Sequence, residues 1–360
     1  MKDFAGKFAV ITGGGTGMGR ELARQLVAEG CNVAMCDVST EAMAETKRLC
    51  EFEQLPQGLR ITTHVADVSI EDQLQRFRDE LAEQQATDRI HLLINNAGIG
   101  GGGSLFTNTR AQWEKTFNIC WGGVYLGVRT FLPMLMKADE GHIVNTSSIN
   151  GFWASVGPGV AHTAYSAAKL EVKGFTEALM NDLRLNAPHI KCSVVMPGHI
   201  GTSIVANSRR IQSGAESDRL SANELLSARQ RLKGMGIDAD TMTDEEVQQN
   251  ALDRARRFRE EAPTTAAQAA RIILDGVKAR ALAHPGRRRR PRHRHARAAG
   301  AGAGLQRGIL SELSRRGRLA AGLATRYPIQ ARERDRPGVQ PGLPAKATCP
   351  QGKRCFPAGS

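Results

Sequence analysis

Short apolar runs alternate with helical stretches from the N-terminus to about residue 196, and this alternation restricts the fold more than any other feature. Because the runs are continuously apolar, they are typical of strands buried on both faces of a sheet. Strands joined by helices pair in parallel, since a parallel connection needs a long crossover. The sequence therefore predicts an α/β fold, with a doubly wound parallel sheet in three layers. The predicted strands cover residues 8–12, 32–37, 61–66, 90–94, 141–146 and 190–196.

Helices are predicted between these strands. Two of them have recognisable starts, because Ser69 and Thr109 are each followed by polar residues that suit the first turn of a helix. The helix capped by Thr109 is expected to run to about residue 137. The other two are predicted over 18–28 and 165–185.

A glycine-rich turn joins the first strand to the first helix, with glycine at positions 13, 14, 15, 17 and 19. Such a turn lets the backbone approach a pyrophosphate closely, and the helix N-terminus after it offers free N–H groups and a positive dipole end. Its place between a buried strand and a helix predicts a dinucleotide site. The candidate residues are Gly13, Thr16, Gly17, Met18 and Gly19.

Asp37 ends the second predicted strand. A carboxylate there can accept hydrogen bonds from an adenosine ribose diol, and it would repel a 2′-phosphate. Neither Lys nor Arg occurs at positions 13–19 or 38–40. The sequence therefore favours NAD over NADP.

The ends of the third and fourth strands supply further candidates, because open α/β sheets bind ligands at the carboxyl ends of their strands. Asn96 has two interpretations, a tie between backbone strands or a direct contact with a ligand. The candidate binding residues are Asp67, Val68, Asn95, Ala97 and Gly98.

Tyr165 and Lys169 are four residues apart and share one face of a predicted helix. A nearby ammonium group stabilises a phenolate, so we expect Lys169 to lower the pKa of Tyr165. Tyr165 could then exchange a proton with an alcohol or carbonyl oxygen near neutral pH. Ser147 and Ser148 end the fifth strand, where a hydroxyl can bond to the same oxygen.

Taken together, these motifs resemble the short-chain dehydrogenase/reductase family over about residues 5–280. The resemblance rests on TGxxxGxG at 12–19, NNAG at 95–98, a serine at the end of the fifth strand, YxxxK at 165–169 and Pro-Gly at 197–198. It implies a Rossmann-type fold and an oxidoreductase that transfers hydride between NAD(H) and a secondary alcohol or ketone.

The resemblance also assigns catalytic roles. Tyr165 matches the family's acid/base, and Lys169 matches the residue that lowers its pKa and binds the nicotinamide ribose. Ser148 matches the residue that orients the substrate oxygen, with Ser147 as the alternative. Asn118 matches the residue that completes a site for a proton-relay water.

Further positions match cofactor contacts of the family. Thr202 corresponds to the residue that contacts the nicotinamide carboxamide and follows Pro197 and Gly198, while Asp67 and Val68 correspond to adenine-side contacts. The catalytic set argues against one rival interpretation, a non-catalytic Rossmann protein with a nucleic-acid-binding tail. Another reaction on the same scaffold, epimerisation or dehydration, stays open.

Residues 203–262 depart from the strand–helix alternation. Ser221 and Thr243 begin capping boxes, which predict two polar helices. We interpret the segment as a substrate lid, with a solvated excursion as the alternative. Near the catalytic tyrosine, the apolar residues Phe152, Trp153 and Val156 suggest a small hydrophobic alcohol or carbonyl substrate, although this loop might only cover the sheet edge.

Charge divides the chain at about residue 280. The whole chain carries a net charge of +13, but residues 281–360 hold 18 Lys and Arg against 3 Asp and Glu. Residues 1–280 hold 31 and 33, a net charge of −2. The catalytic body therefore gives no reason to expect nucleic-acid binding.

The basic tail occupies the place where the family fold has its last strand. Pro285 and the arginines after it do not suit a buried strand, so that strand is expected to be missing or disrupted. Three interpretations compete for residues 281–360: a disordered phosphate-binding arm, an inert disordered extension, and a change of reading frame near residue 280. A homodimer or homotetramer is implied by the resemblance if this C-terminus is native.

No run of consecutive apolar residues approaches the ~18 that a membrane helix needs, and the N-terminus lacks a secretory pattern. The cysteines of residues 1–280 show neither paired nor metal-ligand spacing. The sequence therefore predicts reduced thiols, no metal site, no membrane association and a cytoplasmic location.

Overall fold

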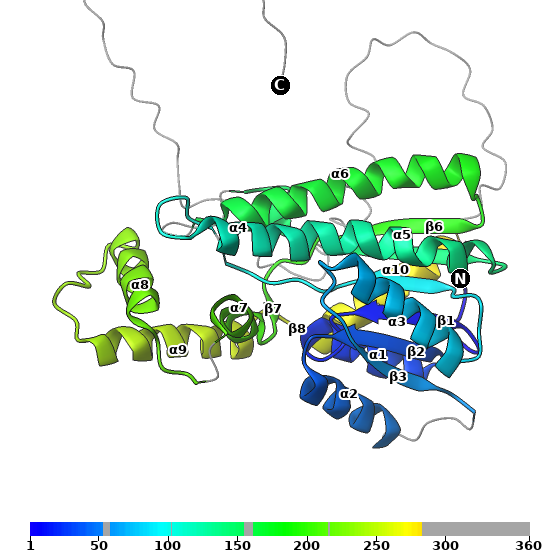
Figure 1. Ribbon diagram of the computed structural model, residues 1–360, viewed down its shortest axis with the longest axis horizontal. Helices are drawn as coiled ribbons and strands as arrows, with labels where there is room; N and C mark the ends of the chain where they lie inside the picture. The colour runs from blue at the N-terminus through cyan, green and yellow to red at the C-terminus, as the bar shows by residue number, and fades with distance from the viewer. Residues whose placement is uncertain (53–57, 102, 155–160, 215–216, 283–360) are drawn as a thin grey trace, which may run out of the picture. The chain divides into compact units, whose positions relative to one another are not determined.

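Six parallel strands form the central sheet in the order β3-β2-β1-β4-β5-β6 (Figure 1). Strand β1 lies between β2 and β4, with Val10 opposite Ala34 on one side and Leu93 on the other. The predicted doubly wound fold is therefore confirmed. The strands are β1 (Phe8–Thr12), β2 (Asn32–Asp37), β3 (Ile61–Val65), β4 (Leu92–Asn95), β5 (Gly141–Thr146) and β6 (Ile190–Val195).

The computed structural model describes residues 1–52, 58–101, 103–154, 161–214 and 217–282. Within these ranges, β6 has one hydrogen-bonded neighbour, β5, and no seventh strand lies on its other side. The tail predicted over 281–360 lies outside the described residues, apart from its first two, which end the last helix.

Helices cover both faces of the sheet. One face carries α1 (Gly17–Ala28), α2 (Thr40–Phe52) and α10 (Ala266–Leu282), and the other carries α3 (Glu71–Gln84), α5 (Gly123–Met136) and α6 (Thr163–Asn186). Three more helices and a two-stranded ribbon follow β6: α7 (Ile204–Ser213), α8 (Ala222–Gly234), α9 (Asp244–Glu260), β7 (Ile200–Gly201) and β8 (Thr264–Thr265).

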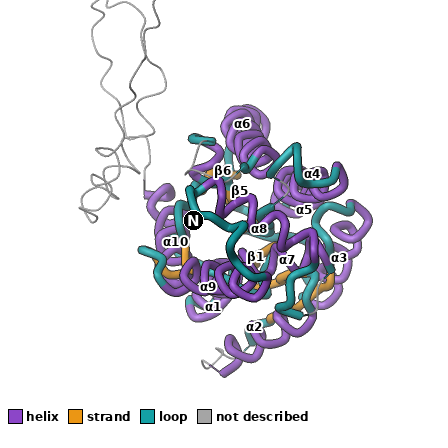
Figure 2. Tube along the Cα trace, turned by 90° about the vertical axis from the view of Figure 1, so that its left-hand side faces the viewer, coloured by secondary structure: helices purple, strands orange, loops and turns teal. Residues whose placement is uncertain are grey.

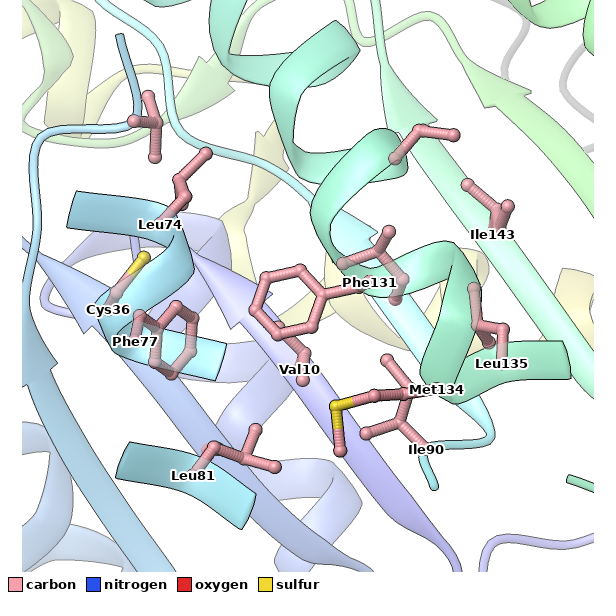
Figure 3. Packing of buried hydrophobic residues seen from close by; sticks show 14 of the residues in the cluster. Val10, Cys36, Leu74, Phe77, Leu81, Ile90, Phe131, Met134, Leu135 and Ile143 are labelled. Atoms are coloured by element: carbon pink, nitrogen blue, oxygen red, sulfur yellow. The ribbon is translucent and has the colours of Figure 1, made fainter. Parts of the chain in front are cut away.

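Alternate residues of the strands supply the two halves of the core. Val10 of β1 faces the layer of α3, α5 and α6, while Ala9 and Ile11 face the layer of α1, α2 and α10. In the first layer, the rings of Phe77 and Phe131 meet edge to face at 5.3 Å beside Val10 (Figure 3). Burial on both faces explains why the strand sequences are continuously apolar.

One local expectation was wrong. Ser69 does not cap α3: the N-cap is Ile70, and the Ser69 hydroxyl instead donates to Asp67 Oδ1 at 2.7 Å. The long helix capped by Thr109 is confirmed over Arg110–Met136, and a π-helical turn, Asn118–Gly122, lies within it between α4 (Arg110–Phe117) and α5. The capping box at Thr109 itself is confirmed.

The segment after β6 has one helix more than predicted. The capping boxes at Ser221 and Thr243 are confirmed at the starts of α8 and α9, and α7 was not foreseen. Figure 2 shows α7, α8 and α9 in front of the sheet, on the side where the strands end.

The stretch Arg110–Met136 is long and apolar enough to cross a membrane by length and composition alone. Here its apolar face packs inside the protein: Val124, Val128 and Leu135 are buried against the sheet. The packing accounts for its apolar character without a membrane.

Candidate active site

The glycine-rich turn lies at the carboxyl end of β1, as predicted. Gly13 and Gly17 have φ angles of +68° and +56°, a region that favours glycine. Gly19 is needed for a different reason, since a Cβ there would overlap the carbonyl oxygen of Gly13. Thr16 is the N-cap of α1, and the first turn of this helix, which includes Met18, contains no acidic residue. The positive end of the α1 dipole is therefore not neutralised within its own first turn.

The Asp37 carboxylate lies against this turn. Its Oδ2 accepts a hydrogen bond from the Gly15 N–H at 2.9 Å, and Oδ1 accepts one from Ser39 at 3.2 Å. The sequence interpretation did not consider Arg20, whose guanidinium donates to the Gly15 carbonyl oxygen at 2.7 Å and to Thr46 at 3.0 Å. The Arg20 side chain thus links the backbone of the glycine-rich turn, at Gly15, to Thr46 on α2.

Asn96 ties β4 to the turn after β1. Its side chain donates to the carbonyl oxygens of Thr12 and Gly13 at 3.1 and 3.2 Å. The Thr12 hydroxyl accepts from the N–H groups of Asn96 and Ala97, both at 3.0 Å. Of the two interpretations of Asn96, the geometry supports the tie between strands.

Asn95 points into the protein interior. Its Nδ2 donates to Asn145 at 2.8 Å, and Asn145 donates to Thr176 at 3.0 Å. Asn95 Oδ1 has no hydrogen-bond partner among the residues that the structure describes, and Gly127 leaves room for it. The Asn95 side chain therefore joins β4, β5 and α6.

Close contacts also fix the residues that follow β3 and β4. Asp67 Oδ1 accepts bonds from the N–H and hydroxyl of Ser69 at 2.9 and 2.7 Å, so this carboxylate shapes the turn after β3. Val68 is buried against the helix that starts at Gly123, where a Cβ would lie 2.5 Å from its Cγ2. Gly98 borders Lys169, since a Cβ there would lie 3.4 Å from Lys169 Nζ.

The two serines after β5 have different surroundings. Ser147 is buried, and its hydroxyl donates to the carbonyl oxygen of Lys169 at 2.6 Å. The Ser148 side chain interacts with that of Tyr165, and its Oγ accepts the Asn150 N–H at 3.2 Å. The geometry therefore favours Ser148 as the residue that orients a substrate oxygen.

Tyr165 and Lys169 lie together near the start of α6, with Lys169 Nζ 5.6 Å from the centre of the Tyr165 ring. Lys169 is buried and donates to the Thr146 carbonyl oxygen at 2.8 Å. The expected lowering of the tyrosine pKa is not found. Burial raises the pKa of Tyr165 above its ordinary value, and the interaction with Ser148 offsets only part of this effect. Burial also lowers the pKa of Lys169.

Asn118 begins the π-helical turn, and its carbonyl oxygen accepts the N–H of Gly123. The same turn places Cys120 near Tyr165 and Lys169, and the sequence interpretation did not single out this cysteine. The thiol is buried, donates to the Ile99 carbonyl oxygen at 3.2 Å, and interacts electrostatically with both Tyr165 and Lys169. The position of Cys120 depends on the π-helical turn, which no local sequence pattern predicts.

The segment after β6 returns to the glycine-rich turn. The Pro197 carbonyl oxygen accepts the Ile149 N–H at 3.0 Å. A Cβ added at Gly198 would have no atom within 4 Å. Thr202 approaches Gly17 so closely that a Cβ on Gly17 would lie 3.1 Å from its Cγ2. From α7, Asn207 donates to the Thr16 hydroxyl at 3.0 Å. Residues predicted from distant motifs thus meet at one end of the sheet.

Two known proteins align with most of the catalytic body. Levodione reductase of Leifsonia aquatica is 33% identical over 225 residues, which cover 62% of this chain and 80% of that protein. The protein SadH of Mycobacterium tuberculosis is 35% identical over 208 residues, 58% of this chain and 72% of that protein.

A solved structure agrees with these alignments. A short chain dehydrogenase/reductase from Burkholderia phymatum in complex with NAD has a TM-score of 0.56 at 28% identity, covering 78% of this chain and 95% of that one. The family model for short chain dehydrogenases matches residues 7–213. This chain therefore belongs to the short chain dehydrogenase family, a family of oxidoreductases.

Proposed function

We propose that this chain is an NAD-dependent oxidoreductase that interconverts a secondary alcohol and the corresponding ketone, with Tyr165 as the acid/base. The observation that carries the proposal is the grouping of three side chains: Lys169 is buried with its Nζ 5.6 Å from the centre of the half-buried Tyr165 ring, and Ser148 interacts with the Tyr165 side chain. The names of two relatives, levodione reductase and meso-2,3-butanediol dehydrogenase, refer to a dione and a diol and agree with this substrate class.

The residues present fit a dinucleotide. The glycine-rich turn and the unneutralised N-terminus of α1 suit a diphosphate. Asp37 offers a carboxylate at the end of β2 for a ribose diol, and Arg20, the nearby cation, is bonded to the Gly15 carbonyl oxygen. Because Gly98 has no side chain, it leaves space for a cofactor beside Lys169. We infer that NAD, rather than NADP, is held by the residues named from the sequence.

A bound nicotinamide cofactor supplies the acceptor or donor of hydride. In ketone reduction, the Tyr165 phenol gives its proton to the carbonyl oxygen, and the Ser148 hydroxyl donates a hydrogen bond to the same oxygen as it becomes an alkoxide. In alcohol oxidation, the hydroxyl proton moves to the Tyr165 oxygen instead. Because burial raises the pKa of Tyr165, its phenol is in the protonated form that reduction requires.

We further propose that residues 203–262 form a lid over a catalytic body of residues 1–280. Within α7, Ser208 accepts the Gly100 N–H at 2.7 Å and Gln212 donates to Thr116 at 2.6 Å. With Asn207 on Thr16, these bonds attach α7 to the ends of β1 and β4 and to α4. Such a lid would exclude water from the reacting carbon.

The experiment that tests the proposal follows NADH absorbance with a panel of secondary alcohols and ketones, in both directions. We expect turnover with NAD(H) and much weaker turnover with NADP(H). No turnover in either direction, from protein shown to bind NADH by fluorescence, would contradict the assignment.

A further inference from the structure

Trp113, Thr163 and Gly103 form a hydrogen-bonded chain between three segments of the protein. The Trp113 Nε1–H donates to the Thr163 hydroxyl at 3.0 Å, and this hydroxyl donates to the Gly103 carbonyl oxygen at 2.8 Å. The directions are fixed, because an indole nitrogen only donates and a carbonyl oxygen only accepts. The chain therefore joins α4, which carries Trp113, to the segment after β4 and to the first residue of α6.

These bonds act at the start of α6, where the first N–H groups of a helix need partners outside it. His162 is the N-cap residue, and its side chain forms no capping bond. The Thr163 N–H instead donates to the Gly103 carbonyl oxygen at 3.1 Å, so one oxygen accepts both the N–H and the hydroxyl of Thr163. Tyr165 follows two residues later, in the first turn that these bonds hold.

Gly103 fits closely against the same turn. It is buried, and a Cβ at this position would overlap the Ala161 carbonyl oxygen and lie 3.1 Å from His162 Cα. Such a close approach of two backbones requires glycine. The segment after β4 therefore leaves the start of α6 little room to move toward it.

Trp113 also contacts the residue that precedes Asn118. Its ring stacks on that of Phe117, with the ring centres 5.2 Å apart and the planes 15° apart. Phe117 is the N-cap of the π-helical turn, whose first residue is Asn118. Contacts of known distance thus lead from the residue next to Asn118 to the residue two positions before Tyr165.

The sequence interpretation expected three apolar residues near Tyr165 instead. Phe152 and Trp153 are 61% and 64% exposed, so both are accessible to a substrate, and Val156 lies outside the described residues. Trp113, in contrast, is half-buried and its donor is already bonded within the protein. Trp113 therefore acts on the protein structure and not on a substrate.

The bond between Trp113 and Thr163 should matter more for rate than for stability. Thr163 is exposed, and a hydrogen bond that water can replace adds little net stability. Proton transfer is more demanding, because the donor must lie within hydrogen-bond distance of the reacting oxygen. A misplacement of about 1 Å can cost about a hundredfold in rate.

We propose that Trp113 and Thr163 are positioning residues for the reaction at Tyr165. Their hydrogen bond holds the first turn of α6 against α4, so that the phenol meets the substrate oxygen in the reacting geometry. This inference rests on the proposed function and adds to it two residues that the sequence motifs do not contain.

The first test removes the Thr163 hydroxyl and then keeps it in a smaller side chain. Thr163→Val should lower kcat by about fivefold to fiftyfold with the best alcohol or ketone substrate, while the Kd of NADH stays close to the wild type. Thr163→Ser should recover most of the rate. The matched control is Thr87→Val, which deletes a hydroxyl that donates to the Arg89 carbonyl oxygen at 3.0 Å, in the turn before β4. The control should leave kcat unchanged.

The second test is a double-mutant cycle. Trp113→Phe keeps a ring that can stack on Phe117 but removes the N–H donor, so kcat should fall to a similar extent. Because both variants break one bond, W113F/T163V should be no slower than the slower single variant. The solvent deuterium isotope effect on kcat should rise in all three, since proton transfer then limits the rate more strongly. Fully additive losses, or a kcat for Thr163→Val equal to that of Thr87→Val, would overturn the inference.

Hydrogen exchange separates this inference from the proposed function, because it needs no substrate. In the full-length chain, the amides of residues 164–170 should exchange about twofold to tenfold faster in Thr163→Val and Trp113→Phe than in the wild type. Thr163→Ser and Thr87→Val should exchange at the wild-type rate. Unchanged exchange in the first two variants would overturn the inference. Wild-type protein that binds NADH but turns over no substrate would contradict the proposed function instead, and the exchange rates would still decide whether this bond anchors α6.

Discussion

Lys169 lies over the face of the Tyr165 ring, with its Nζ 5.6 Å from the ring centre. The ammonium donates a hydrogen bond to the Thr146 carbonyl oxygen at 2.8 Å. Loss of hydration therefore dominates the titration of both side chains, raising the pKa of Tyr165 and lowering that of Lys169.

This arrangement predicts opposite pH dependences for the two directions of the reaction. Oxidation needs the deprotonated Tyr165, and the raised pKa makes that form scarce at neutral pH. With hydride transfer limiting, alcohol oxidation should rise with pH from about 7 to about 10, while ketone reduction should stay nearly level over the same range. Initial rates at saturating cofactor check this. An oxidation rate that already reaches a plateau near pH 7 would show that the tyrosine titrates lower than the structure indicates.

Asp37 should control the choice of cofactor. Removing its carboxylate with Asp37→Ser deletes an acceptor for the ribose and the charge that opposes a 2′-phosphate. We expect kcat/KM for NAD to fall by about tenfold to a hundredfold and the value for NADP to rise. Steady-state kinetics with both cofactors measure the ratio. An unchanged NAD/NADP ratio would argue that Asp37 only orders the turn through Gly15 and Ser39.

The two serines after β5 form a matched pair for separating catalysis from stability. Ser148→Ala should lower kcat by about 10²-fold or more, because a donor to the developing alkoxide is lost, and should leave the melting temperature nearly unchanged. Ser147→Ala should destabilise the protein by about 1–2 kcal/mol, since a buried bond to Lys169 disappears. Urea unfolding and turnover are measured on both variants. The reverse pattern would assign the substrate oxygen to Ser147.

The packing around Asn95 gives a test of the core. Gly127→Ala would place a methyl group against Asn95 Oδ1 and should cost about 1–3 kcal/mol of stability. Gly174→Ala on α6 meets nothing within 4 Å, so it should raise stability by about 0.4–1 kcal/mol. Urea denaturation compares the two. Equal effects would mean that the contact between α5 and β4 is looser than described.

Much of the fold could be predicted because its signals are local. Strand burial, the glycine-rich turn and the capping boxes at Thr109, Ser221 and Thr243 each depend on a few adjacent residues, and the structure contains them all. The Ser69 cap failed for a local reason too, because its hydroxyl bonds to Asp67 instead of to the helix.

The rest depends on contacts between distant segments. The titration of Tyr165 is set by burial, which the four-residue spacing from Lys169 does not reveal. The distinction between Ser147 and Ser148 requires knowing which one lies under α6.

The central claim, that Tyr165 moves the proton, is tested most directly by Tyr165→Phe. This variant keeps the ring and removes the hydroxyl, so NADH binding measured by fluorescence should stay close to the wild type. Turnover should fall by about 10²- to 10⁴-fold, the usual contribution of general acid–base catalysis. Near-normal turnover in Tyr165→Phe, with NADH still bound, would contradict the account.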